Sequence, residues 1–183
     1  MNELEQRVQW LEDRWAINDL LVKYSVTIDD RDIAGLVELY TEDAVFDGVM
    51  GPMRGRTAIG EYYEQRTGEF GATYHIPYSH AVERTSDSEA TGIVLAAAEL
   101  AIGDEAFMIA LRYTDQYVKG DDGTWRFRKR DIEQLYAMPL SDLPAGLASD
   151  LRKRWPGTEP APAELPEGTS TWQAHQARLR SSG

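Results

Sequence analysis

Residues 91–137 read TGIVLAAAELAIGDEAFMIALRYTDQYVKGDDGTWRFRKRDIEQLYA and contain a repeated strand pattern. Segments rich in β-branched and aromatic residues alternate with short groups of turn-forming residues, which is typical of neighbouring strands joined by tight turns. With one further segment upstream, the predicted strands lie near 78–86, 91–102, 105–118 and 124–137. The separators are Ser86–Ser88, Gly103–Asp104 and Gly120–Gly123. We therefore predict four consecutive antiparallel strands.

The sequence before these strands is helical in pattern. Leu4, Val8, Leu11 and Trp15 recur at spacings of four, three and four, and an apolar side continues to residue 28. A second helix is predicted from Ile33, a short strand at 44–46, and a third helix around 58–63 that ends near Gly68. Helices followed by consecutive strands predict an α+β fold, with the helices packed on one face of a curved antiparallel sheet.

Composition bounds the class of protein. The 183 residues carry 19 Lys and Arg against 31 Asp and Glu, and this net charge of −12 argues against a nucleic-acid partner. No cysteine is present, which excludes a disulfide, a thiolate zinc site and a cysteine nucleophile. The sequence shows no leader peptide and no apolar run of the roughly 18–20 residues that a membrane span needs, so we expect a cytoplasmic protein without a membrane partner.

A change of composition near residue 138 predicts the domain boundary. Six of the eight prolines lie from Pro139 onward, whereas the strand pattern ends at residue 137. We expect one domain at 1–137 and a proline-rich C-terminal extension at 138–183 that lies over the domain or crosses to a neighbour.

Glu99 breaks the apolar pattern of its strand. By the two-residue alternation it shares a face with Ile93, Leu95, Ala97 and Ala101, and a buried carboxylate is costly unless it is paired or protonated. A titratable group in an apolar pocket suits acid–base chemistry. The alternative is that Glu99 reaches solvent, or pairs with Arg112 or Arg130.

Three other residues are candidates that also have structural explanations. His80 lies on the neighbouring strand and could partner Glu99, but a strand histidine is more often part of a core or rim. Asp29 could cap the following helix, and Tyr24 could be helix core. Continuous alternation places His75 and His80 on opposite faces, which disfavours a shared metal. We expect neither a metal nor a cofactor.

Several local patterns resemble the SnoaL-like branch of the NTF2-like superfamily over about residues 10–137. They are Ile17–Tyr24, Asp29-Asp-Arg-Asp, Leu36-x-x-Leu-Tyr-x-x-Asp-Ala, Gly55-Arg-x-Ala-Ile, Tyr113-x-Asp115 and Asp122-Gly-x-Trp-Arg-Phe. The resemblance implies a cone-shaped, cystatin-like fold, in which helices and a strongly bent antiparallel sheet enclose a mostly apolar pocket.

Within that superfamily the chain is most similar to dehydratase-type members, namely scytalone dehydratase, bile-acid 7α-dehydratase and the lindane dehydrochlorinase. These use an Asp–His dyad, which the resemblance carries onto Asp29 and His80. It likewise carries a helix tyrosine onto Tyr24 and a polar pocket residue onto Glu99. The implied function is a cofactor-independent lyase that eliminates water, or a similar leaving group, from a small aromatic or polycyclic substrate.

Other readings remain open at this point. The same dyad could serve an isomerase, or a lyase that cleaves a carbon–carbon bond by retro-aldol loss of formaldehyde. A non-catalytic domain that binds a small ligand or associates with a partner is also consistent with the superfamily. The apolar stripe of the first helix and the aromatic Trp10, Trp15, Trp155 and Trp172 predict a homodimer or homotrimer, unless these tryptophans cover the domain's own core.

Overall fold

The computed structural model describes residues 2–181. Three helices precede or interrupt the first strands: α1 (Glu3–Asp29), α2 (Ile33–Glu38) and α3 (Gly55–Gly68). A capping box starts α1, because Asn2 and Glu5 each accept a hydrogen bond from the other's backbone N–H. Asp32, rather than Asp29, caps α2 by accepting from the Gly35 N–H. Asp29 is therefore free of the capping role considered for it.

Six strands form one open sheet in the order β2-β1-β6-β5-β4-β3. Their bounds are β1 (Tyr40–Gly48), β2 (Gly51–Arg54), β3 (Thr73–Arg84), β4 (Glu89–Ile102), β5 (Glu105–Lys119) and β6 (Trp125–Pro139). The four consecutive antiparallel strands are confirmed as β3–β6. The sheet is mixed rather than wholly antiparallel, since β1 lies parallel to β6 after the chain has passed through α1 and α2.

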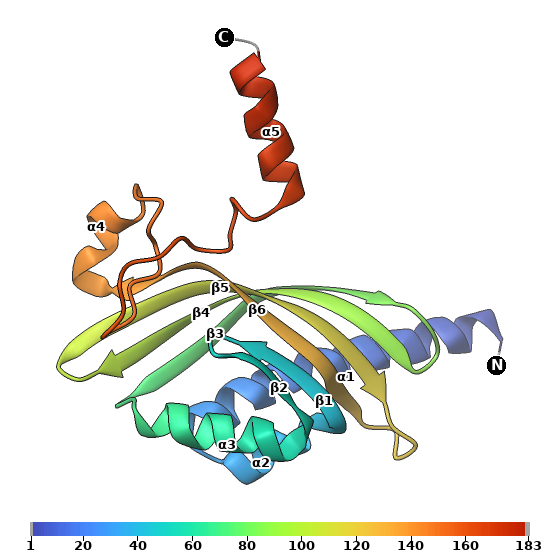
Figure 1. Cartoon of the computed structure of the whole chain (residues 1–183). Coiled ribbons are helices and arrows are strands. Elements are labelled where there is room, and N and C mark those ends of the chain that lie inside the picture. The colour runs from blue at the N-terminus through green and yellow to red at the C-terminus, as the bar shows by residue number, and fades with distance from the viewer. Residues whose placement is uncertain (1, 182–183) are drawn as a thin grey trace.

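The curved sheet and the helices enclose the core (Figure 1). The helices α1, α2 and α3 lie on the concave side, and alternate residues of β4 point towards them: Ala90, Val94, Ala96, Ala98 and Leu100 are buried. The predicted α+β architecture, with helices packed on one face of a bent sheet, is confirmed. Curvature matters for function because it leaves a hollow between the sheet and the helices.

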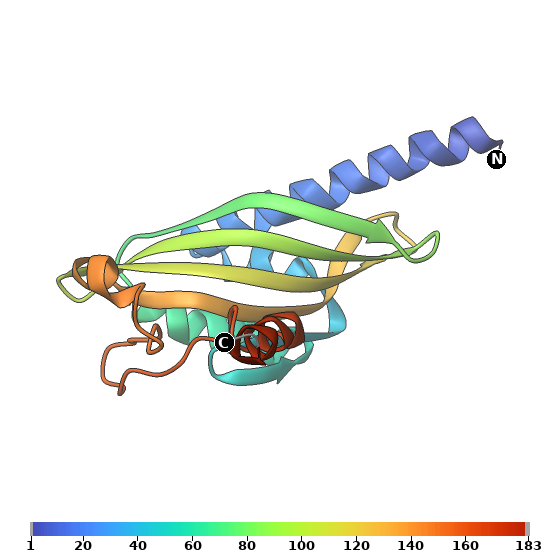
Figure 2. The same ribbon diagram turned by 90° about the horizontal axis from the view of Figure 1, so that it is seen from above.

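Residues 138–181 begin inside the last strand and continue over the end of the sheet. A 3-10 turn η1 (Leu140–Asp142) and helix α4 (Leu143–Gly146) follow β6, and Lys153 forms bridges with both Ala137 and Ala161. The final helix α5 (Ser170–Ser181) projects away from the sheet (Figures 1 and 2). We call residues 138–183 the C-terminal extension.

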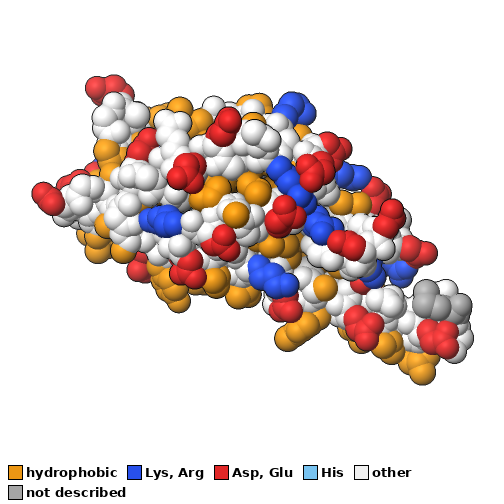
Figure 3. All heavy atoms as spheres, turned by 90° about the horizontal axis from the view of Figure 1, so that it is seen from below, with side chains coloured by type: hydrophobic (Ala, Val, Ile, Leu, Met, Phe, Trp, Pro, Cys, Tyr) orange, Lys and Arg blue, Asp and Glu red, His pale blue; other side chains and the backbone are white. Residues whose placement is uncertain are grey.

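The surface carries the acidic balance of the sequence. On the face that α1, α2 and α3 cover, acidic side chains are spread between basic and apolar ones (Figure 3). No helix within residues 2–181 combines the length and the apolar character that a membrane crossing requires.

Candidate active site

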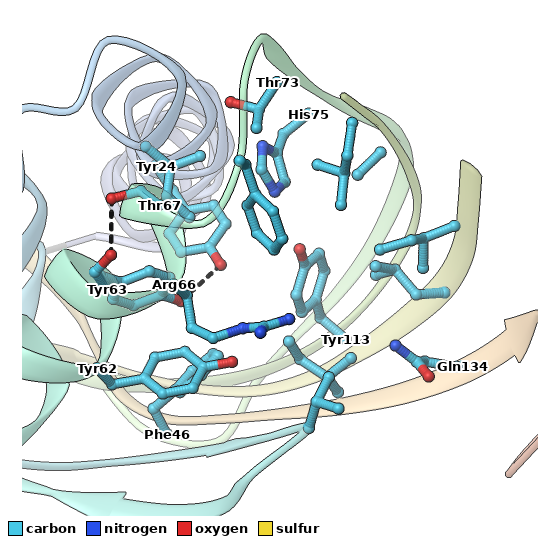
Figure 4. A pocket seen from close by; sticks show the side chains of 18 of the residues that line it. Tyr24, Phe46, Tyr62, Tyr63, Arg66, Thr67, Thr73, His75, Tyr113 and Gln134 are labelled. Carbon is cyan, nitrogen blue, oxygen red and sulfur yellow. Dashed lines mark hydrogen bonds between the residues drawn. The ribbon is translucent and has the colours of Figure 1, made fainter. Parts of the chain in front are cut away.

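A mostly apolar cavity lies between the concave face of the sheet, the end of α1 and helix α3. All the space between its lining atoms, including the part that is open to solvent, amounts to about 630 Å³. Figure 4 shows tyrosines from α1, α3 and β5 around it. Its apolar walls include Ile28, Phe46, Phe70, Leu100, Ile109 and Ile132.

Asp29 and His75 form a hydrogen-bonded pair at one end of this cavity. Asp29 is the last residue of α1 and His75 the third residue of β3, and Asp29 Oδ1 lies 2.7 Å from His75 Nδ1. The same carboxylate accepts from the backbone N–H of His75 at 2.8 Å and from the hydroxyl of Thr73 at 2.9 Å. Three donors thus hold the carboxylate in one orientation.

The environment of Asp29 favours its ionised form. Burial raises the pKa of this carboxyl, but the hydrogen bonds from the His75 ring and backbone and from Thr73, together with the imidazole's charge, outweigh burial and lower the pKa below its usual value. An ionised Asp29 makes Nδ1 of His75 the protonated nitrogen and leaves Nε2 as the free acceptor. The His75 side chain lines the cavity, which gives the cavity a positioned base (Figure 4).

Tyr24 stands beside this pair inside the cavity wall. Its ring meets that of His75 edge to face at a centroid distance of 6.4 Å, and its hydroxyl lies 2.7 Å from the hydroxyl of Tyr63. Burial is the main cause that raises the pKa of Tyr24, and the neighbouring Tyr40 adds to it, so the phenol stays protonated at neutral pH. Tyr24 is therefore the helix-core residue considered for it, and it also brings a protonated hydroxyl to the cavity wall.

A buried ion pair supports Tyr24 from behind. The guanidinium of Arg130 lies 4.3 Å from the ring centre of Tyr24 and donates two hydrogen bonds, of 2.8 and 2.7 Å, to Asp115. Both charged side chains are almost completely withdrawn from solvent. Removing two charges from water is costly, so the attraction within such a pair is largely offset by desolvation.

The predicted contact between Asp29 and His80 is wrong. His80 lies further along β3, where its Nε2 is 3.2 Å from the hydroxyl of Tyr117, whereas Asp29 contacts His75. Burial lowers the pKa of His80 more than the carboxylate of Asp115 raises it, whereas direct pairing with a carboxylate would favour a raised pKa.

Two local features explain the error. Strand β3 begins at Thr73, five residues before the predicted start, so His75 belongs to the strand rather than to a loop. A register irregularity between Pro77 and Ser79 then breaks the alternation. As a result His75 pairs with Ala98 and His80 with Val94, and both partners are buried on the concave side. The spacing of five residues had excluded this arrangement.

Glu99 is also misplaced by the prediction. Its strand alternation with Ile93 and Leu95 is correct, but their shared face is the convex one, where Ile93 and Leu95 are each 47% exposed. Glu99 is exposed and lies outside the cavity, which confirms the alternative that it reaches solvent. The concave face of β4 presents Ala98 and Leu100 to the cavity instead.

Sequence reasoning missed His75, Arg66 and the Arg130–Asp115 pair as site residues. Arg66 reaches the cavity from α3, and Gln134 and Trp155 line it from β6 and the C-terminal extension. Asp115 was visible in the pattern Tyr113-x-Asp115, and Arg130 only as a possible partner of Glu99. Their contact depends on the pairing of β5 with β6, in which Asp115 is opposite Arg130.

A family model described as a SnoaL-like domain matches residues 9–131, which is more than half of the chain. The chain belongs to the SnoaL-like family. The match covers α1 from residue 9 and every strand up to the first half of β6, and hence Tyr24, Asp29 and His75.

Of two relatives of this SnoaL-like protein, one is uncharacterised and the other is an enzyme with a named activity. An uncharacterised protein of Mycobacterium tuberculosis is 30% identical over 124 residues, which are 66% of this chain and 84% of the relative. A gamma-hexachlorocyclohexane dehydrochlorinase of Sphingobium indicum is 28% identical over 138 residues, which are 73% of this chain and 87% of the enzyme. Relatives of this chain thus include an enzyme.

Solved structures agree on the fold. A protein of Novosphingobium aromaticivorans that is assigned as a scytalone dehydratase superposes with a TM-score of 0.68 at 23% identity, covering 72% of this chain and 90% of that one. An NTF2-like protein with a cystatin-like fold from the same organism gives a TM-score of 0.61 at 21% identity, covering 70% and 86%. The NTF2-like, cystatin-like fold predicted from the sequence is confirmed.

Proposed function

We propose that this SnoaL-like protein is a cofactor-independent lyase that eliminates water, or a similar leaving group, from a small apolar substrate. The observation that carries the proposal is the 2.7 Å contact between Asp29 and His75 at the end of an apolar cavity. A base in such a cavity can remove a proton from carbon, which water-exposed histidines do poorly. The similarity to a dehydrochlorinase, an enzyme named for removing hydrogen chloride, supports elimination over other proton transfers.

His75 performs the proton transfers in this mechanism. Its Nε2 takes the proton from the carbon next to an electron sink, and the electrons of that C–H bond form a double bond to the neighbouring carbon. The leaving group departs with the electrons of its own bond. If it is a hydroxyl, the imidazolium returns the proton and water is released. Asp29 stabilises the imidazolium and fixes its tautomer throughout, as the aspartate of a serine-protease triad does.

Tyr24 stabilises the negative charge that develops on the substrate. Its phenol is protonated, and its ring contacts the ring of His75. It can therefore donate a hydrogen bond to a carbonyl oxygen of the substrate as the neighbouring carbon is deprotonated. A donor in a dry cavity contributes more than one in water, because little solvent screens the charge.

The direct test is elimination activity of His75→Gln and Asp29→Asn on a panel of aryl β-hydroxy ketones and γ-hexachlorocyclohexane. We expect a loss of about 10²–10⁴-fold in His75→Gln, the usual contribution of a general base, and a smaller loss in Asp29→Asn. Glu99→Gln is the matched control: it neutralises an acidic side chain on the convex face and should retain wild-type activity.

Product analysis separates the alternative reactions. Elimination yields water or chloride, isomerisation moves a double bond without a released product, and retro-aldol cleavage releases formaldehyde. Turnover by His75→Gln close to that of the wild type would contradict the proposed base, and a released aldehyde would contradict elimination.

We also propose that the protein associates with copies of itself as a homodimer or homotrimer. The first helix keeps its apolar stripe uncovered: Leu4, Leu11 and Trp15 are all exposed, Trp15 by 70%. Trp10 and Trp155 instead pack against the core of their own chain. The exposed part of the stripe supports a contact beyond the domain itself.

A further inference from the structure

Arg66 places a positive charge in the wall of an otherwise apolar cavity. It extends from the last turn of α3 towards the lumen, on the side of the cavity away from His75 (Figure 4). A series of ring contacts runs from His75 through Tyr24 and Tyr63 to Tyr62, which interacts with Arg66. Among the described residues that line the cavity, none is an aspartate or a glutamate.

The guanidinium is held in place by an ion pair and by two aromatic rings. Its Nη1 contacts Glu69 Oε2 at 2.5 Å, and its carbon lies 4.9 Å from the ring centre of Phe70 and 5.4 Å from that of Trp155. The side chain of Arg66 is 19% exposed, whereas that of Glu69 is 47% exposed. Solvent therefore screens the counter-ion more than the cation, and the pair contributes less than a buried one would.

Two neutral donors stand beside Arg66. The Tyr62 phenol is kept protonated, since burial raises its pKa more than the charge of Arg66 lowers it. The side-chain oxygen of Gln134 accepts from the indole N–H of Trp155 at 3.5 Å, so its amide nitrogen is turned to the cavity (Figure 4). Although Glu69 pairs with Arg66 from outside the cavity lining, the cation and the two neutral donors on the lining itself form the complement of an oxyanion.

We propose that this end of the cavity binds a carboxylate or comparable oxyanion of the ligand, so that the protein acts on small apolar acids. The apolar walls take the body of the molecule, and Arg66 takes its acidic group with one or both neutral donors. Naming this ligand as the substrate rests on the proposed lyase function; the binding preference itself does not. Arg66 is a specificity-determining residue here, and it is separate from the base at His75.

Affinity for a matched pair of probes tests the proposal without any chemistry. Isothermal titration calorimetry compares 2-naphthoate with 2-naphthamide, which has nearly the same shape but no charge. The wild type should prefer the carboxylate by about tenfold or more, the range of a charge-assisted hydrogen bond. Arg66→Met should remove this preference while binding naphthamide as the wild type does.

Three further variants make the result specific to charge. Arg66→Lys keeps the cation and should retain most of the preference. Glu69→Gln frees Arg66 from its counter-ion and should raise affinity for naphthoate alone, which a purely structural role for Arg66 would not produce. His75→Gln should leave the preference intact, which separates this site from the proposed base.

Several results would overturn the proposal. They are a wild type that binds the two probes equally or not at all, a preference that survives Arg66→Met, and a preference lost in His75→Gln instead. Equal loss of both probes in Arg66→Met and Arg66→Lys would make Arg66 a support for Trp155 and also count against the proposal. Inactivity in every elimination assay would contradict the lyase function and leave the binding result standing.

Discussion

Asp29 shows how much of the site depends on one carboxylate. Its two oxygens accept hydrogen bonds from the His75 ring, the His75 backbone N–H and the Thr73 hydroxyl. The guanidinium of Arg31 in turn donates a hydrogen bond of 2.6 Å to the Thr73 hydroxyl oxygen. Arg31 itself has a backbone φ of 62°, a left-handed conformation that brings its side chain back over the end of α1. The end of α1, the start of β3 and the loop between α1 and α2 thus meet at the acid that orients the proposed base.

The lowered pKa of Asp29 predicts a pH-dependent contribution to stability. The unfolded state binds this proton more tightly, so the contribution is complete above the unfolded pKa of about 3.9 and is lost as pH falls through the lower folded pKa. Asp29→Asn should cost about 1–3 kcal/mol in unfolding free energy at pH 7, with the gap closing at acid pH. Urea unfolding across pH 3–7 measures it.

Asp104→Asn is the control for that experiment, since it makes the same change of charge in the exposed turn between β4 and β5. Its unfolding curves should follow the wild type at each pH. A gap between Asp29→Asn and the wild type that stays constant down to pH 3 would show that the carboxyl is not stabilised in its ionised form.

Strand β4 leaves space beside the site because Gly92 has no side chain. Gly92 sits on its concave face, and a Cβ there would lie 2.6 Å from His80 Nε2 and 2.8 Å from a ring carbon of Tyr117. The absent side chain lets Tyr117 cross β4, reach His80 and donate to Asp115 at 2.7 Å. Through Asp115 this arrangement also supports Arg130 and the ring of Tyr24.

Gly92→Ala should therefore destabilise the protein by about 1–3 kcal/mol, because Tyr117 and His80 must move to admit a methyl group. Gly68→Ala, at the end of α3, is matched to it: nothing lies within 4 Å of the new Cβ, and alanine is the better helix residue. Denaturant titrations should rank Gly68→Ala at or above the wild type. Equal stability of all three proteins would exclude the crowding argument.

At the scale of the whole molecule, apolar surface is left uncovered on two sides. One is the exposed stripe of α1, whose N-terminal half extends beyond the sheet (Figure 2). The other is the convex face, where Tyr78, Ile93 and Leu95 are exposed.

The cavity is closed in part by Trp155. The ring of Trp155 stacks on that of Phe107 at a centroid distance of 4.8 Å and joins the C-terminal extension to the domain.

Light scattering of the full chain should give a mass of two or three times 20.6 kDa. The expectation follows from the exposed apolar stripe, whose burial between copies would be favourable. A double variant, Leu11→Lys with Trp15→Lys, should lower the mass, whereas Val49→Lys, at an exposed position far along the chain from the stripe, should not. A mass of a single chain for the wild type would contradict self-association.

The sequence alone was sufficient for the periodic parts of the molecule. Helix α1, the four consecutive strands and the alternation around Glu99 follow from local spacing, which backbone geometry imposes residue by residue. The contact partners required the tertiary structure. An irregularity between Pro77 and Ser79 and an early start of β3 replace His80 with His75 beside Asp29, and the curvature of the sheet puts Glu99 outside. Which face is concave depends on how all six strands bend together, and no local pattern carries that information.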